Sequence, residues 1–238
     1  MIDALDHFAI TGSAGAYETL LGRRAVNGRV QTGNVGLTFG AAGDALSSMA
    51  FQTGDLDKAA RLLERRAVPG ERKADRLVLA RAATHGVPIE LCERQERAAS
   101  SPLAGCDEAA AISALDHVVV RTPDPERAIA FYAGRLGLDL RLDRSNPAWG
   151  ARLLFFRCGD LAVEIAHDLK KGVSDGPDHL WGLSWRTPDI AQAHARLKAT
   201  GIDVSEPRDG RRPGSQVFTV KDHTEGVPTL VIGGIGRW

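Results

Sequence analysis

The chain repeats itself. Residues 4–11 read ALDHFAIT and residues 114–121 read ALDHVVVR, so the two segments match at an offset of 110. Residues 84–91, THGVPIEL, match residues 224–231, TEGVPTLV, at an offset of 140. Matches that recur in the same order along a chain indicate a duplicated structural unit. The repeat therefore restricts this chain to folds built from several copies of one small module.

The copy that opens near residue 114 shows what the module contains. Residues 115–121 form a β-branched run that predicts a strand, in which a single histidine, His117, interrupts the apolar residues. Asp124 and Pro125 are typical of a helix N-cap followed by proline at the first helical position. Apolar residues then recur at helical spacing up to Gly137, which is placed to end the helix. The module begins as a strand that leads directly into an amphipathic helix.

Further copies and later strands complete the pattern. Residues 51–56, FQTGDL, match residues 185–190, WRTPDI, and each segment leads into a helical pattern. Residues 153–158 and 161–167 predict two strands joined by a tight turn. In the first copy, His7 and Tyr17 are five residues closer together than His117 and Tyr132, so its helix should be short or irregular. Strands outnumber helices and no GxGxxG motif occurs, which argues against a doubly wound dinucleotide fold.

These observations predict an α+β protein with two similar halves. We expect an N-terminal half over residues 1–94 with abbreviated modules, and a C-terminal half over residues 112–238. Residues 95–111 are rich in Ala, Ser and charged residues and are predicted to be a linker.

Charge and cysteine usage exclude several classes of protein. The 30 Lys and Arg residues balance the 30 Asp and Glu residues, which argues against a general affinity for nucleic acid or acidic membranes. No apolar run approaches the roughly 20 residues of a membrane-spanning helix, and no signal-peptide pattern is seen. The three cysteines include no CxxC pair. We expect a cytoplasmic protein whose thiols are ordinary packing residues.

The four-fold module, with LDH opening each half, resembles the vicinal oxygen chelate superfamily, which includes glyoxalase I, bleomycin-resistance proteins and extradiol dioxygenases. The resemblance covers nearly the whole chain and implies tandem βαβββ modules that pair into curled mixed sheets. It implies fold more strongly than chemistry, because the superfamily contains lyases, isomerases, oxygenases and binding proteins.

Alternation along the strands indicates which side chains face the cup of such a sheet. Large apolar residues should lie under the helices; they include Phe8, Phe51, Val120 and Trp185. The opposite face carries smaller and more polar residues, namely His117, Val119 and Arg121 on one strand and Gly182, Ser184 and Arg186 on another. Glu164 lies between Ala162 and Ala166, so its carboxylate should point into the cup toward a cation, a donor or water.

In metal-using relatives, a divalent ion is held by residues that open the first strand and close the last strand of paired modules. By the resemblance, the metal-ligand candidates are His117 and Glu164, with Glu90 and His7 as weaker ones. Of the remaining positions, the second half has Gly182 and Leu230, and the first half has a position near Gly36 and another at Ser48. The site therefore looks incomplete. A divalent metal (Fe, Mn, Zn or Ni) is therefore not a certain cofactor, although Glu90, His117 and Glu164 would converge if the second and third modules paired.

Three classes of function remain open, one of which is a degenerate structural domain, such as the first half alone, that needs neither a pocket nor a metal ion. In the first, the cup of the second half binds a small anionic or oxygen-rich molecule, using the substrate-binding candidates Arg121, Ser184, Arg186 and Trp149. In the second, the chain is a metal-dependent lyase, isomerase or extradiol-type dioxygenase, with His117 and Glu164 as its catalytic residues. The expected partner is a small-molecule ligand, with neither nucleic acid nor membrane, and a homodimer is one option.

Overall fold

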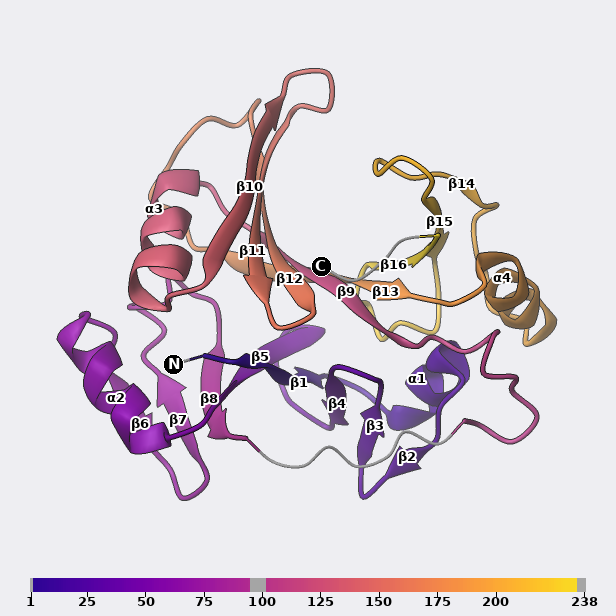
Figure 1. Cartoon of the computed structure of the whole chain (residues 1–238), viewed down its shortest axis with the longest axis horizontal. Coiled ribbons are helices and arrows are strands. Elements are labelled where there is room, and N and C mark those ends of the chain that lie inside the picture. The colour runs from indigo at the N-terminus through magenta and orange to yellow at the C-terminus, as the bar shows by residue number, and fades with distance from the viewer. Residues whose placement is uncertain (1, 95–101, 235–238) are drawn as a thin grey trace. The chain divides into compact units, whose positions relative to one another are not determined.

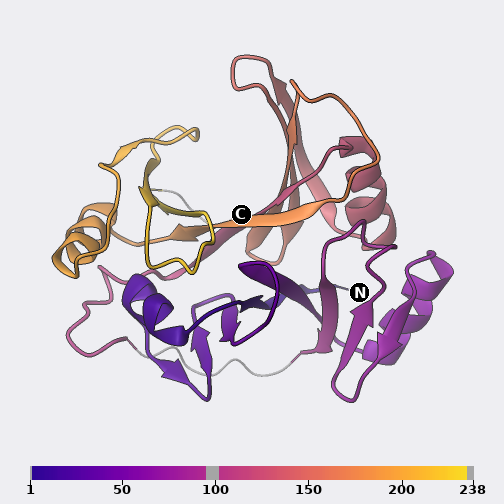
Figure 2. The same cartoon turned by 180° about the vertical axis from the view of Figure 1, so that it is seen from behind.

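The computed structural model describes residues 2–94 and 102–234. Figure 1 and Figure 2 show its helices and strands from two opposite sides. The first half contains β1 (Ala4–Ile10), α1 (Ala14–Leu21), β2 (Ala25–Val26), β3 (Arg29–Gln31), β4 (Gly36–Phe39), β5 (Leu46–Thr53), α2 (Leu56–Arg65), β6 (Gly70–Arg72), β7 (Arg76–Leu79) and β8 (Ile89–Glu93). The second contains β9 (Ala114–Arg121), α3 (Pro125–Ile129), η1 (Ala130–Arg135), β10 (Asp139–Asn146), β11 (Ala151–Cys158), β12 (Leu161–Asp168), β13 (His179–Arg186), α4 (Ile190–Ala199), β14 (Arg208–Asp209), β15 (Gln216–Val220) and β16 (Thr229–Gly233).

The strands form two sheets of eight that share one topology. The order is β2-β3-β4-β1-β5-β8-β7-β6 in one sheet and β10-β11-β12-β9-β13-β16-β15-β14 in the other. Three modules pair their first strand in parallel with their last, namely β1 with β4, β5 with β8 and β13 with β16. The neighbouring pairs are antiparallel, as in β10–β11–β12. The predicted fold class, tandem βαβββ modules in mixed sheets, is confirmed, and β9 and β13 are neighbours in one sheet.

The helix starts follow from local sequence. The Asp124 side chain accepts a hydrogen bond of 3.0 Å from the backbone N–H of Arg127, and Pro125 takes the first helical position. Asp55 and Asp189 cap α2 and α4 in the same way. The first module has Ser13 at this position, whose side chain makes no capping hydrogen bond, and its helix spans only eight residues. The predicted shortening of the first helix is confirmed.

The third module departs from the sequence pattern within its helix. After Ile129 the turns widen into the π-helix η1, which the apolar spacing did not predict. The helix then ends before Gly137, whose φ of 78° is in the left-handed region that favours glycine. The Tyr132 ring packs against Phe156 of β11, with ring centroids 5.5 Å apart. In Figure 1, α3 accordingly runs along one side of β10, β11 and β12.

The four apolar residues expected beneath the helices are fully buried, each with 0% exposure: Phe8, Phe51, Val120 and Trp185. The three cysteines are free thiols. None of the helices within the described ranges is both long enough and apolar enough to cross a membrane.

Contacts between Cα atoms divide the chain into two compact units. Unit 1 comprises residues 1–6, 48–95 and 118–181, and unit 2 comprises residues 7–47, 96–117 and 182–238. Each unit thus takes segments from both halves of the sequence. The boundaries expected at residues 94 and 112 stay a prediction.

The predicted linker falls partly outside the described residues, which resume at Pro102. Its described part is packed in unit 2, where Ala111 is fully buried. Arg23 donates a hydrogen bond of 2.8 Å to the carbonyl of Ile112 and forms an ion pair with Glu108. A charged side chain of the first half therefore anchors the segment that leads into β9.

Candidate functional site

In unit 1, the face of the sheet that lies opposite the helix is set by strand register. Arg144 pairs with Leu153 across β10 and β11, and Leu153 pairs with Ala166 across β11 and β12. The backbone N–H of Thr122 donates to the carbonyl of Ala166, which places Arg121 at the end of the same row. Directly opposed residues share one face of a sheet. We call these four residues the Arg121–Arg144 row: a cation at each end, with small and apolar side chains between.

Both arginines of this row lie over tryptophan rings. The Arg121 guanidinium carbon is 4.0 Å from the centroid of the Trp181 ring, and that of Arg144 is 5.1 Å from the centroid of the Trp149 ring. Both arginines are exposed, and the two tryptophans are 38–39% exposed. Such cation–π contacts orient a guanidinium while leaving its N–H groups in the plane of the fork available.

Glu164 lies one row along the same face. It pairs with Phe155 across β11 and β12, and Phe155 pairs with Leu142 of β10. Glu164 is 8% exposed, so this carboxylate lies at the floor of the face beside an aromatic ring. The row beside the two cations is therefore mainly apolar, with one buried acceptor.

In unit 2, His117 is held by its sequence neighbour. Nδ1 of His117 is 2.8 Å from Oδ2 of Asp116, whose side chain is 1% exposed. Nη1 of Arg212, from the loop between β14 and β15, lies 3.8 Å from the other carboxylate oxygen of Asp116. A carboxylate on one imidazole nitrogen fixes the orientation of the ring and directs its other nitrogen away from that carboxylate. The sequence analysis singled out His117 but not its partner Asp116.

Strand β13 supplies the other predicted residues of unit 2. Ser184 is 4% exposed and Arg186 is 7% exposed. At Gly182, an added Cβ atom would lie 2.6 Å from the carbonyl oxygen of Pro228, so no side chain fits there without a backbone shift. Glycine at this position is required by packing, and the position cannot supply a metal ligand.

The first-half candidate His7 faces a basic neighbour. His7 pairs with Gly36 across β1 and β4, and a side chain at position 36 would collide with the guanidinium of Arg29. The Arg29 Nε donates a hydrogen bond of 3.1 Å to the side chain of Gln31. A cation therefore lies beside the strand position that His7 faces, which disfavours a divalent ion at His7.

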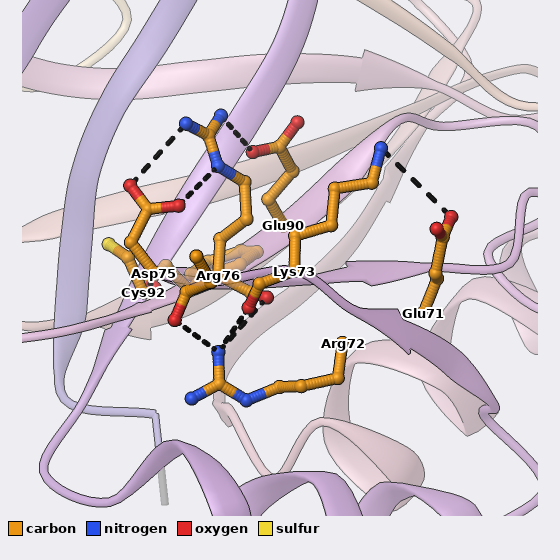
Figure 3. Close-up of polar contacts among 9 residues, drawn as sticks. Glu71, Arg72, Lys73, Asp75, Arg76, Glu90 and Cys92 are labelled. Carbon is orange, nitrogen blue, oxygen red and sulfur yellow. Dashed lines mark hydrogen bonds and ion pairs between the residues drawn. The ribbon is translucent and has the colours of Figure 1, made fainter.

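The other first-half candidate, Glu90, forms an ion pair. Figure 3 shows the Arg76 guanidinium between two carboxylates, with Nη1 3.2 Å from Oε2 of Glu90 and Nε 3.1 Å from Oδ1 of Asp75. The hydrogen bond that Arg76 donates to Asp75 is the largest cause of its raised pKa; burial, the next largest cause, lowers this pKa, and the charge of Glu90 raises it by less. The negative charge of Glu90 is thus paired with Arg76 within unit 1.

The predicted site residues are divided between the two compact units. Glu90, Arg121, Trp149 and Glu164 belong to unit 1, and His7, His117, Ser184 and Arg186 belong to unit 2. Their roles stay predictions. Within residues 2–94 and 102–234, no three His, Cys, Asp or Glu side chains form a group that could hold a metal ion.

Sequence reasoning did not identify Arg144 or Arg212. Arg144 gains its place only through the register of β10 on β11. The fold of the loop between β14 and β15 brings Arg212 to Asp116. His167 is 5% exposed, with Nδ1 3.1 Å from the carbonyl oxygen of Thr122.

Comparison with known proteins agrees with this architecture. The family model described as Glyoxalase/Bleomycin resistance protein/Dioxygenase superfamily matches residues 114–228. The ethylmalonyl-CoA/methylmalonyl-CoA epimerase of Cereibacter sphaeroides is 29% identical to this chain, over 42% of this chain and 81% of its own length.

Two solved structures match the full length. A halotolerant catechol dioxygenase aligns with a TM-score of 0.71 at 14% identity, over 100% of this chain and 89% of its own. The 2,2',3-trihydroxybiphenyl 1,2-dioxygenase of Sphingomonas wittichii aligns with a TM-score of 0.71 at 17% identity, over 100% of this chain and 92% of its own. At such identities these structures establish the fold alone. Residues 114–228, the greater part of the second half, thus match the glyoxalase/bleomycin resistance protein/dioxygenase superfamily, also called the vicinal oxygen chelate superfamily, and both sheets share one topology.

Proposed function

We propose that this protein binds a small anionic or oxygen-rich organic molecule on the inner face of its C-terminal half and that its metal site is incomplete. The observation that carries the proposal is the state of Arg121. This arginine is exposed and lies 4.0 Å over the ring of Trp181. Within the described residues it forms neither an ion pair nor a hydrogen bond.

A guanidinium in this state suits a carboxylate or a phosphate. Stacking on Trp181 restricts the side chain, so less conformational entropy is lost when an anion binds. The charge-assisted hydrogen bonds that such an anion accepts contribute roughly 1.5–3 kcal/mol. The neighbouring Ala166 leaves room for the ligand, and the exposed Leu142, one row along the same face, offers apolar surface to its body. Arg121 would therefore bind the charged group of a partly apolar molecule.

Unit 2 supports the same preference for oxygen-rich ligands. Arg186 and Ser184 lie on β13 with little exposure, and His117 lies on β9 with its ring oriented by Asp116. In our proposal these three residues are donors within unit 2 itself: Arg186 supplies positive potential there, while Ser184 and His117 offer hydrogen bonds to the oxygens of a ligand.

The donor set supports an incomplete metal site. Packing requires glycine at position 182, Arg29 lies over Gly36 beside His7, and Glu90 pairs with Arg76. A divalent first-row metal needs at least three protein donors for firm binding at a catalytic site. The residues at these positions do not fit that requirement, so we derive no chemical step through a metal.

Ligand titration tests the proposal. We expect benzoate to bind wild-type protein at least tenfold more tightly than neutral benzamide, as measured by calorimetry. Arg121→Ala should weaken benzoate binding about tenfold, which is about 1.4 kcal/mol. Arg61→Ala, which removes an exposed arginine of α2 in the same unit, should leave binding unchanged. Equal affinity for both probes, or an unchanged Arg121→Ala variant, would overturn the proposal. Methylmalonyl-CoA, a thioester with a free carboxylate named in the description of the Cereibacter sphaeroides relative, is the second probe.

The alternative is a metal-dependent lyase, isomerase or extradiol-type dioxygenase with ligands from more than one module. Elemental analysis of the purified protein separates the two. One equivalent of Fe, Mn, Zn or Ni that is lost in both His117→Ala and Glu164→Ala would establish the alternative. Substoichiometric metal that these substitutions do not change would support the binding function.

A further inference from the structure

We propose that the inner face of unit 1 takes a ligand with two anionic groups, one at each end of an apolar body, bound by Arg121 and Arg144. This inference rests on the proposed function and names the class of its ligand. Arg144 was not among the residues that the sequence pointed to.

Arg121 and Arg144 differ from the other arginines nearby in their polar contacts. Arg152 pairs with Asp143 and Glu126, each at 2.7 Å, and Arg141 pairs with Asp139 at 2.9 Å. In contrast, Arg121 and Arg144 form no ion pair and no hydrogen bond within the described parts of the chain. Each instead lies over an exposed tryptophan. This face therefore presents two oriented cations that no carboxylate of the described residues neutralises.

Strand register limits the distance between the Cα atoms of the two arginines. Arg121 and Arg144 occupy the first and fourth strands of the Arg121–Arg144 row, on β9 and β10 with β12 and β11 between them. Neighbouring strands lie about 4.8 Å apart, so the two Cα atoms are at most about 14 Å apart. Each guanidinium is held over its own tryptophan, Trp181 of β13 for Arg121 and Trp149 in the turn between β10 and β11 for Arg144, so an elongated molecule with an anion at each end suits the pair better than a single carboxylate does.

The surface between the cations is suited to an apolar body. Leu153 and Ala166 lie between the arginines in the row, and Leu142 and Phe155 form the adjacent row. Leu142 is 43% exposed, so a ligand chain that lies on this face would cover it. The buried carboxylate of Glu164 ends this second row and would disfavour a third anionic group near the middle of the ligand.

A chain-length series tests the inference. Suberate and sebacate carry a carboxylate at each end of an alkyl chain, and octanoate carries one. Calorimetry on the full-length protein should show suberate or sebacate binding with 1:1 stoichiometry, at least tenfold more tightly than octanoate. Arg144→Ala should remove this tenfold advantage and leave octanoate affinity unchanged. Arg121→Ala should weaken the binding of both classes.

Arg141→Ala is the matched control, because it removes a paired arginine from the same strand as Arg144. It should keep the preference for dicarboxylates. Equal affinity for octanoate and the dicarboxylates in the wild-type protein, or an Arg144→Ala variant that keeps the preference, would overturn the inference while the proposed function stands. If neither octanoate nor the dicarboxylates bind the wild-type protein, the inference fails, and a parallel failure of benzoate then removes the proposed function as well.

Discussion

The hydroxyl of Tyr17 donates a buried hydrogen bond of 3.0 Å to the carbonyl of Thr224, which lies 207 residues further along the chain. The corresponding region of unit 1, around Tyr132, makes different contacts. There the His85 ring packs on Phe131, with centroids 5.7 Å apart, and the backbone N–H of Asp178 donates to the carbonyl of His85. Tyr132 takes the place of Tyr17, but its buried hydroxyl has no hydrogen-bond partner among the described residues. The two copies of one tyrosine therefore differ in a single hydrogen bond.

This difference predicts opposite effects of the same substitution. Tyr17→Phe should lower the free energy of unfolding by about 1 kcal/mol, because a buried hydrogen bond is lost. Tyr132→Phe should leave the free energy of unfolding unchanged or raise it by up to about 1 kcal/mol, because it removes an unpaired buried hydroxyl. Urea denaturation of the two variants measures both effects. Equal losses in the two variants would contradict the assignment of the hydrogen bonds.

The same tyrosines predict a loss of stability in alkali. Burial, with a smaller contribution from Glu225, raises the pKa of Tyr17, and burial with a smaller contribution from Asp178 raises the pKa of Tyr132. An unfolded tyrosine ionises near pH 10. Since the folded pKa lies above the unfolded one, the contribution to stability is complete below about pH 10 and falls as the pH rises further. Each tyrosine should contribute a slope of up to about −1.4 kcal/mol per pH unit.

Denaturation at pH 8 and at pH 11 measures this slope. Tyr132→Phe should show a shallower fall than the wild-type protein, because one of the two groups is gone. An identical fall in both proteins would mean that Tyr132 is not the group that resists ionisation in the folded state.

The tryptophans predict a contrast in packing energy. Trp185→Ala should cost about 3–5 kcal/mol, because the side chain is fully buried and its removal leaves a cavity. Trp181→Ala, in the same strand but 38% exposed, should cost less than about 1 kcal/mol. Thermal melting compares the two variants. A Trp185→Ala protein that melts at the wild-type temperature would show that the facing of β13 is assigned backwards.

The helix caps predict a further contrast between modules. Asp124→Ala should lower the free energy of unfolding by about 1 kcal/mol, since its carboxylate accepts from the N–H of Arg127 at 3.0 Å. Ser13→Ala should cost much less, because the Ser13 side chain makes no capping hydrogen bond. Chemical denaturation measures both values, and a larger loss for Ser13→Ala would contradict the helix starts described above.

Local sequence predicted the features that depend on neighbouring residues. The Asp124–Pro125 start, the Gly137 end and the hairpin of β11 and β12 follow from capping, backbone conformation and turn chemistry, all of which act over a few residues. The repeat added long-range information, because four similar modules imply four similar strand and helix arrangements. The arrangement of strands and helix within each module could therefore be predicted without any contact being known, whereas which modules share a sheet could not.

The site was less accessible to such reasoning. Whether Arg144 faces the same side as Arg121 depends on the register of β10 against β11, and that register includes a shift between Leu140 and Leu142. The role of Arg29 depends on where its long side chain lies, which spacing along the sequence does not determine. Exposed charged residues all look alike in a sequence, and only their partners distinguish them.

The make-up of the compact units has a consequence for any attempt to shorten this protein. A cut within residues 95–101 yields two fragments that correspond to the sequence repeats, yet each fragment holds only part of unit 1 and part of unit 2. Neither fragment would retain the Tyr17–Thr224 hydrogen bond or the contact of His85 with Phe131, because each joins a residue of one fragment to a residue of the other. The repeats are the duplicated segments of the sequence. The smallest piece able to fold is set by contacts that run between these repeats. Mixing the two fragments should restore what each one lacks, in the manner of a split reporter.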